Sequence, residues 1–98
     1  MENKTICRTP TLGKKPTQID SWKFELIRKA ILEIVPKSGS GILFKDLTNL
    51  VKEKIPFAKL NEIGSMKWYV VSVKLEMEVN NEVYRIPKSQ PQRLLKQI

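Results

Sequence analysis

Two stretches with helical periodicity, each closed by a proline, constrain the fold of this chain most strongly. Apolar residues recur at helical spacing over residues 24–35 and again over residues 44–55. Pro36 and Pro56 follow these stretches directly, and the residue before a proline avoids helical geometry. The sequence therefore predicts two helices that end at these prolines, and a connection without regular structure over residues 57–64.

The apolar faces of the two predicted helices are expected to pack against each other. With 98 residues, the chain is long enough for one small domain with one hydrophobic core. The side chains expected to fill this core are Phe24, Ile27, Ile31, Leu47, Leu50 and Val51. Trp22, at the start of the first helix, is expected to be less buried than Trp68.

Residues 65–79 fit two different structures. As a strand, residues 71–79 alternate between apolar and polar side chains, and Asn80 and Asn81 would turn the chain into a partner strand at residues 82–87. As a helix, the same segment has two apolar stripes on nearly opposite sides. One stripe contains Trp68, Val71, Leu75 and Val79, and the other contains Met66, Val70, Val73 and Met77. Periodicity alone slightly favours the strand.

The C-terminal residues predict a β-ribbon with a basic tip. Residues 83–86 have the composition of a strand, residues 88–91 have turn chemistry, and residues 92–98 would return as a second strand. A further, very short strand is expected at residues 42–43. From residue 83 to the end there is no acidic residue, whereas four positions are basic: Arg85, Lys88, Arg93 and Lys96.

Residues 1–19 are expected to form a flexible basic arm, so that the folded domain spans residues 20–98. The N-terminal segment shows no apolar period, and its polar composition is typical of a disordered terminus. Between residues 3 and 19 it has no acidic residue and four basic ones: Lys4, Arg8, Lys14 and Lys15.

The charge balance and the missing residue types narrow the function. Lysine and arginine number 18 against 10 acidic residues, for a formal net charge of +8, which favours polyanionic partners such as nucleic acid. The chain has no histidine and one cysteine, Cys7, so it lacks the residues of imidazole-based catalysis and of thiolate metal clusters. We therefore expect no enzymatic activity, no cofactor and no metal site. No apolar run is long enough to span a bilayer, so we expect a cytoplasmic protein without membrane contact.

The order of the predicted elements resembles a winged helix-turn-helix domain. This is an α+β fold of three helices with a small C-terminal antiparallel β-ribbon, the wing. The resemblance implies that residues 65–79 form the third helix, with Trp68 and Leu75 largely buried. In that interpretation Ser65 would cap the helix at its start.

A motif within the same region resembles a small uncharacterised prokaryotic family. That family has a Trp-Tyr pair, a Val-Lys-Leu-acid-Leu-Glu run and an Ile-x-Arg strand, which correspond here to Trp68 and Tyr69, to residues 73–78 and to the strand with Arg85. The family has a glycine where this chain has Asn81, and asparagine also tolerates the left-handed conformation of a helix cap. The resemblance implies no particular chemistry.

The winged-helix resemblance and the basic charge together predict a nucleic-acid-binding module, specifically a double-stranded DNA-binding protein of the transcription-regulator type. The third helix would lie in the major groove and the wing would contact phosphates or the minor groove. The residues expected to contact nucleic acid are Lys67, Lys74, Arg85, Lys88, Gln90, Arg93, Lys14 and Lys15. The alternative is a protein-interaction or homodimerisation module that uses the stripe from Met66 to Met77, if the monomer leaves that stripe exposed.

Overall fold

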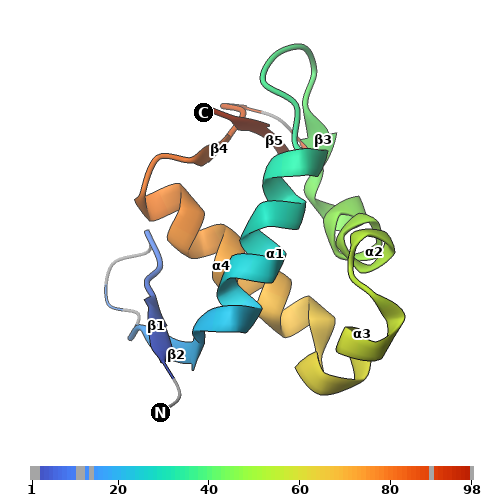
Figure 1. Ribbon diagram of the computed structural model, residues 1–98. Coiled ribbons are helices and arrows are strands. Elements are labelled where there is room, and N and C mark those ends of the chain that lie inside the picture. Colours follow the sequence, from blue (N-terminus) through green and yellow to red (C-terminus); the bar gives the residue numbers. More distant parts are fainter. Residues whose placement is uncertain (1–2, 11–12, 14, 89, 98) are drawn as a thin grey trace.

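The computed structural model describes residues 3–10, 13, 15–88 and 90–97. It has an α+β architecture with two small antiparallel sheets, and α4 lies across the back of α1 while α2 and α3 lie to one side of both (Figure 1). The elements in chain order are β1 (Lys4–Cys7), β2 (Thr17–Asp20), α1 (Ser21–Ile34), β3 (Ile42–Leu43), α2 (Phe44–Lys54), α3 (Phe57–Ile63), α4 (Met66–Val79), β4 (Val83–Arg85) and β5 (Arg93–Lys96).

The three-stranded sheet joins the C-terminal ribbon to the short strand between the first two helices. Its order is β3-β5-β4, with antiparallel pairing of Ile42 to Leu94 and of Tyr84 to Leu95. Gly41 makes the close approach possible, because its φ is +74° and a Cβ there would lie 2.5 Å from the carbonyl oxygen of Leu94. The predicted ribbon and the predicted very short strand are therefore both confirmed.

Residues 66–79 form a helix, and the hairpin alternative for this segment is wrong. At the end of α4, Asn81 has a φ of 60°, the left-handed conformation expected from the resemblance. The N–H of Glu82 donates to the carbonyl of Met77 at 2.8 Å, and the N–H of Asn81 donates to the carbonyl of Glu78 at 3.1 Å. These two bonds form a Schellman motif. Ser65 occupies the N-cap position, but its side chain makes no capping hydrogen bond.

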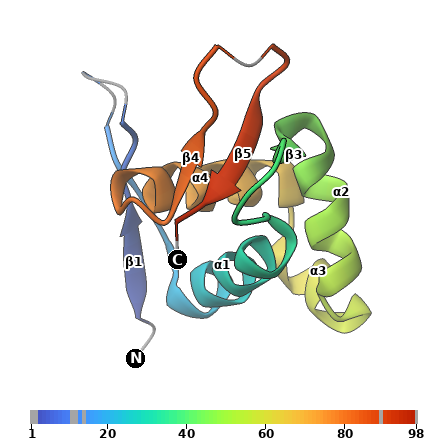
Figure 2. The ribbon, with the colours of Figure 1, turned by 90° about the horizontal axis from the view of Figure 1, so that it is seen from above.

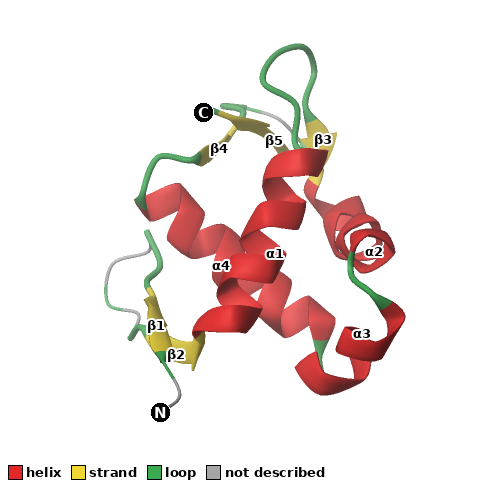
Figure 3. Ribbon diagram, in the orientation of Figure 1, coloured by secondary structure: helices red, strands yellow, loops and turns green. Residues whose placement is uncertain are grey.

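The described residues contain four helices, not the three that the sequence predicts, because the expected connection at residues 57–64 is mostly the short helix α3 (Figure 3). Only Ile63 of α3 is buried, and Phe57 is 82% exposed. With one buried position in seven residues, this helix has no apolar period that a sequence pattern could reveal. It ends at Gly64, which has a φ of 93°.

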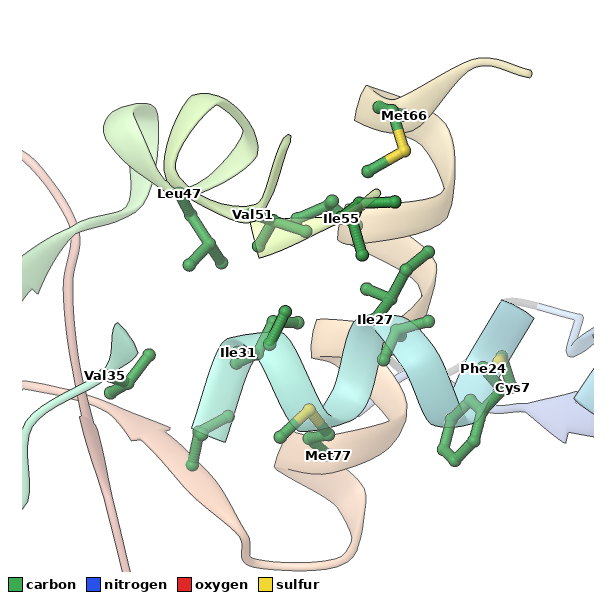
Figure 4. Close-up of a cluster of buried hydrophobic side chains, with 14 of the residues drawn as sticks. Cys7, Phe24, Ile27, Ile31, Val35, Leu47, Val51, Ile55, Met66 and Met77 are labelled. Atoms are coloured by element: carbon green, nitrogen blue, oxygen red, sulfur yellow. The ribbon is translucent and has the colours of Figure 1, made fainter. Parts of the chain in front are cut away.

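The hydrophobic core lies between α1, α2 and α4. Ile27 and Ile31 of α1 point toward Leu47 and Val51 of α2, and Met77 of α4 approaches α1 from the other side (Figure 4). All five side chains are fully buried. The predicted core positions Phe24, Ile27, Ile31, Leu47 and Val51 are therefore confirmed. Leu50 is only half-buried, because it lies at the edge of the apolar face of α2.

The fully buried stripe of α4 is not the one that contains Trp68, which the sequence predicts to be largely buried. The stripe Met66, Val70, Val73 and Met77 is at most 5% exposed, and it faces α1 and α2. Trp68 is 45% exposed, against 43% for Trp22, so the expected order of burial of the two tryptophans is wrong. Leu75, on the stripe of Trp68, is half-buried. A helix can bury only one of two opposite stripes when a single layer of helices covers it.

The N-terminal residues form a β-hairpin that packs on the helices, which corrects the expectation of a flexible arm. Strands β1 and β2 pair antiparallel, with Lys4 opposite Asp20 and Cys7 opposite Thr17. Cys7 and Ile19 are each 3% exposed, and burial raises the pKa of the Cys7 thiol to about 11. Each strand has four residues and contributes only one side chain to the core, so the pattern is too short to predict.

We also compared the helices of the described residues with the length and composition of a membrane-spanning helix. None of the helices there combines the length and the apolar character needed to cross a bilayer.

Candidate nucleic-acid interface

Two chain segments that are far apart in the sequence project to the same side of α4. Figure 2 shows the described residues of the β1–β2 and β4–β5 connections extending beyond α4, on the side away from α1. The outer side of α4 therefore lies between the N-terminal hairpin and the C-terminal ribbon. A convex helix flanked by two projecting loops is a shape that fits a rod-like partner such as a nucleic-acid duplex.

Most of the residues expected to bind nucleic acid belong to these three elements. Lys15 is in the β1–β2 connection, Lys67 is in the first turn of α4, and Lys88 and Gln90 are in the β4–β5 connection; all four are exposed. Arg93, at the start of β5, is half-buried. Among the described residues, none pairs with the cationic groups of these lysines or of Arg93. Lys14 lies outside the described residues.

Arg85 is exposed, but its charge is already offset. Its Nε donates to Oε1 of Glu78 at 2.7 Å, and the Glu78 side chain is only 9% exposed. The guanidinium is therefore oriented toward α4 by a charge-assisted hydrogen bond. A phosphate at this position would have to compete with Glu78, so Arg85 contributes less to a basic surface than the sequence suggests.

Lys74 does not face a nucleic acid, and its expected role as a contact residue is wrong. Its side chain is 2% exposed, and its Nζ donates to Glu78 at 3.1 Å and to the side chain of Gln92 at 3.2 Å. The same ammonium lies 4.4 Å from the centre of the Phe44 ring. Burial lowers the pKa of Lys74, while the nearby Glu78 acts in the opposite direction. Lys74 thus holds α4, α2 and the start of β5 together.

Lys96 is likewise a structural residue. Its Nζ donates to the carbonyl of Leu32 at 2.7 Å, and its backbone N–H donates to the carbonyl of Pro36 at 2.9 Å. These carbonyls belong to the last turn of α1 and the residues after it, where a cation is favoured by the helix dipole. The number of basic residues in the ribbon is therefore larger than the number that are available to bind anions.

No sequence pattern indicates the polar cluster that holds the N-terminal hairpin on α4. Arg8 donates from its backbone N–H at 2.8 Å and from its Nε at 3.0 Å to Oε1 of Glu76, and from its Nη2 at 2.7 Å to Oε2. Asn80 completes the cluster by donating to Glu76 at 2.9 Å. The hydrogen bonds from Arg8 are the main reason why the pKa of Glu76 lies below its usual value.

The lowered pKa of Glu76 predicts a specific dependence of stability on pH. A carboxyl group with a depressed folded pKa stabilises the protein above its unfolded pKa, and this contribution is lost as the pH falls through the folded pKa. We expect Glu76→Gln to lower the free energy of unfolding most at pH 7, and the gap to wild type to shrink below about pH 4.5, the ordinary value for the group. Urea denaturation from pH 7 to pH 3 measures this gap, with Glu53→Gln on the exposed side of α2 as control. A gap that stays constant over this range would contradict the assignment.

The outer side of α4 is poor in groups that read bases. Trp68 is exposed there, and Val71, Ser72 and Leu75 are half-buried. Lys67 is the one exposed cation of α4, all of whose residues are described. Base edges are read mainly by Arg, Asn, Gln and Lys side chains. The arrangement is therefore suited to phosphate contacts from the two projecting connections more than to sequence readout by the helix.

Comparison with family models assigns the chain to a family. Residues 4–94 match the model described as "Family of unknown function (DUF6958)", and the chain belongs to this family. The expectation of an uncharacterised family is confirmed to this extent. Comparison with curated proteins and with solved structures gave no match.

Proposed function

We propose that this protein is a winged-helix module that binds double-stranded DNA by contacting the phosphates of the DNA backbone. The arrangement that supports this proposal is α1–β3–α2–α4–β4–β5 with the sheet order β3-β5-β4. It corresponds to the helix, short strand, second helix, third helix and wing of a winged helix-turn-helix domain. The short helix α3 is then an addition between the second and third helices.

The observation that carries the proposal is that α4 and the two connections that project beyond it each carry an exposed lysine for which the described residues offer no partner. Lys15 and Lys88 come from the two connections that project beyond α4, and Lys67 comes from α4 itself. Each lies in a segment far from the others in the sequence. The phosphates of a duplex attract such cations whatever the base sequence, and the release of counterions drives the binding.

The proposed binding has little sequence preference. Lys74 is buried between α4, α2 and β5, so it cannot reach a base. The remaining polar groups on the outer side of α4 are those of Lys67 and Ser72 within the described part of the chain. Phosphate contacts fix the position of a protein on DNA but do not specify bases.

Fluorescence anisotropy with a labelled duplex of random sequence tests this proposal. If Lys15, Lys67, Lys88 and Arg93 each neutralise one phosphate, the logarithm of the association constant should fall with that of the salt concentration at a slope of about −3.6. We expect a dissociation constant on the order of 10 µM at low salt, similar for unrelated sequences. Absence of binding at low salt would reject DNA as the partner.

A second candidate function, protein interaction, is favoured by a different surface. The stripe from Met66 to Met77 is buried and cannot serve this purpose. Phe57, in contrast, is 82% exposed at the start of α3. The residue before it, Pro56, borders a hollow of about 550 Å³ together with Trp22, Leu26, Lys59 and Glu62. Exposed aromatic side chains are typical of the central residues of protein interfaces.

A second copy of the chain is the partner for which this surface can be tested directly. Phe57 directly follows Pro56, which lines the hollow, so two molecules related by a twofold axis could each insert Phe57 into the hollow of the other. In that case sedimentation equilibrium should show a concentration-dependent dimer, and Phe57→Glu should remove it. Ile6→Glu, which changes another exposed apolar residue, is the control and should leave the dimer intact. A monomer at all concentrations would reject self-association through this surface.

A further inference from the structure

A pocket lies between the N-terminal hairpin and the outer side of α4. Its volume is about 380 Å³, and it is bounded by Trp68, Val71 and Leu75 of α4 and by Cys7, Lys15 and Thr17 of the hairpin. This volume is within the usual range of small-molecule sites, about 300 to 1,000 Å³. The pocket exists only because the hairpin packs on α4 instead of remaining an arm.

The helix side of the pocket is apolar and incompletely covered. Trp68 is 45% exposed, although a tryptophan usually buries most of its surface. Val71 and Leu75 lie one and two turns further along the same side of α4 and are half-buried. An apolar ligand placed here would remove the exposed ring face of Trp68 from water.

The hairpin side of the pocket carries a positive charge. Lys15 is exposed, and no described residue forms an ion pair or hydrogen bond with its ammonium group. Glu76, the acid that holds the hairpin on α4, accepts hydrogen bonds from Arg8 and Asn80 instead. The Cys7 thiol is protonated and uncharged at neutral pH, since its pKa is about 11. The pocket therefore combines an apolar wall with the ammonium group of Lys15, which has no partner among the residues that the structure describes.

We propose that this pocket binds a small aromatic carboxylate, with its ring against Trp68 and Leu75 and its carboxylate beside Lys15. The hydroxyl groups of Thr17 and Ser72, which also border the pocket, can donate to the second carboxylate oxygen. A neutral aromatic compound would gain the ring contact only, and a simple anion would gain the charge contact only. The site thus selects compounds that combine the two, and it does so whether or not the protein binds DNA.

Nuclear magnetic resonance with phenylacetate as the probe tests this site. The chain has two tryptophans, and Trp22 is exposed to nearly the same degree as Trp68 but lies outside the pocket, so its indole N–H signal is an internal control. We expect a saturable shift of the Trp68 signal with a dissociation constant on the order of 1 mM, and no saturable shift of the Trp22 signal. The neutral analogue 2-phenylethanol should bind about 10-fold more weakly, because it lacks the charge-assisted contact to Lys15.

Variants then separate the two parts of the site. Lys15→Gln should reduce the affinity for phenylacetate to that for 2-phenylethanol, whereas Lys45→Gln, at an exposed lysine of α2, should leave both unchanged. Equal affinities for the acid and the alcohol in wild type, or equal shifts of both tryptophans, would overturn the proposal. A Trp68 shift with oligothymidylate but none with phenylacetate would also overturn it, and would identify the pocket as a site for single-stranded nucleic acid, in which bases stack on aromatic side chains.

Discussion

Glu78→Ala is expected to lower the free energy of unfolding by about 3–5 kcal/mol, the usual cost of removing one partner of a buried ion pair. Glu78 accepts from Lys74 at 3.1 Å and from Arg85 at 2.7 Å. Without its carboxylate, the ammonium of Lys74 would remain between α4, α2 and β5 with only Gln92 and the face of the Phe44 ring as partners. An uncompensated buried charge is destabilising because the lost hydration is not replaced.

The variant Lys74→Met removes the buried charge but keeps most of the packing of the side chain. Methionine fills a similar volume, and Glu78 would keep its hydrogen bond to Arg85, so we expect a change within about 1 kcal/mol. The double variant Lys74→Met/Glu78→Ala should recover most of the loss seen with Glu78→Ala alone. Arg85 then loses its partner, but its side chain is 48% exposed, and an exposed cation is hydrated by water.

Urea denaturation of wild type, the two single variants and the double variant gives the coupling energy of the pair directly. Glu62→Ala is a matched control, because Glu62 also pairs with a lysine at 3.1 Å, but both side chains are more than half exposed, and such pairs contribute little. A loss of less than about 1 kcal/mol for Glu78→Ala would mean that water reaches Lys74 in solution.

Local patterns were sufficient for the elements that bury a regular face. The helices α1 and α2 follow from apolar spacing and from Pro36 and Pro56, since each helix buries one continuous face. The ribbon β4–β5 follows from two short apolar runs around a turn. These elements are specified by residues that are neighbours in the sequence, and such signals are the most reliable ones in a single chain.

The segment that became α4 shows where local patterns fail. Its alternation over residues 71–79 favours a strand, and only the resemblance to winged-helix domains favoured a helix. The choice between its two stripes depends on which side α1 and α2 cover, and nothing within the segment itself contains that information. Consequently Trp68 was expected in the core, whereas it lies on the outer side, at the edge of the pocket.

Among the candidate site residues, the sequence predicted exposure correctly only where exposure does not depend on contacts with distant parts of the chain. Lys15, Lys67 and Lys88 are in connections or at a helix start and are exposed as expected. Lys74 is a polar residue of a helix and was therefore expected to be exposed. It is buried instead, and one of its partners, Gln92, lies 18 positions away in the sequence. Arg8 and Glu76 are 68 positions apart, and no spacing rule joins them. Sequence patterns identify charges but not their partners.

Reversal of two cations of the β4–β5 ribbon, the proposed wing, by Lys88→Glu with Arg93→Glu is expected to weaken binding to duplex DNA on the order of 100-fold or more at low salt. Each residue would exchange a charge-assisted phosphate contact for repulsion, and hydrogen bonds to charged groups contribute about 1.5–3 kcal/mol each. The salt dependence should change as well. With two of four phosphate contacts removed, the slope should fall from about −3.6 to about −1.8.

A second double variant shows whether the loss of affinity comes from the position of the two charges or from the change in net charge. Lys29→Glu with Lys52→Glu changes two exposed lysines of α1 and α2, and like the wing variant it lowers the formal net charge of +8 by four units, two for each substitution. Both variants are also compared at about 0.1 M salt, where charges beyond a Debye length of about 10 Å are largely screened. If the wing contacts the phosphates, the control should retain most of the affinity there. Equal losses in the two variants would mean that the basic protein attracts DNA through its overall charge, and that the placement of the wing beside α4 has no part in binding.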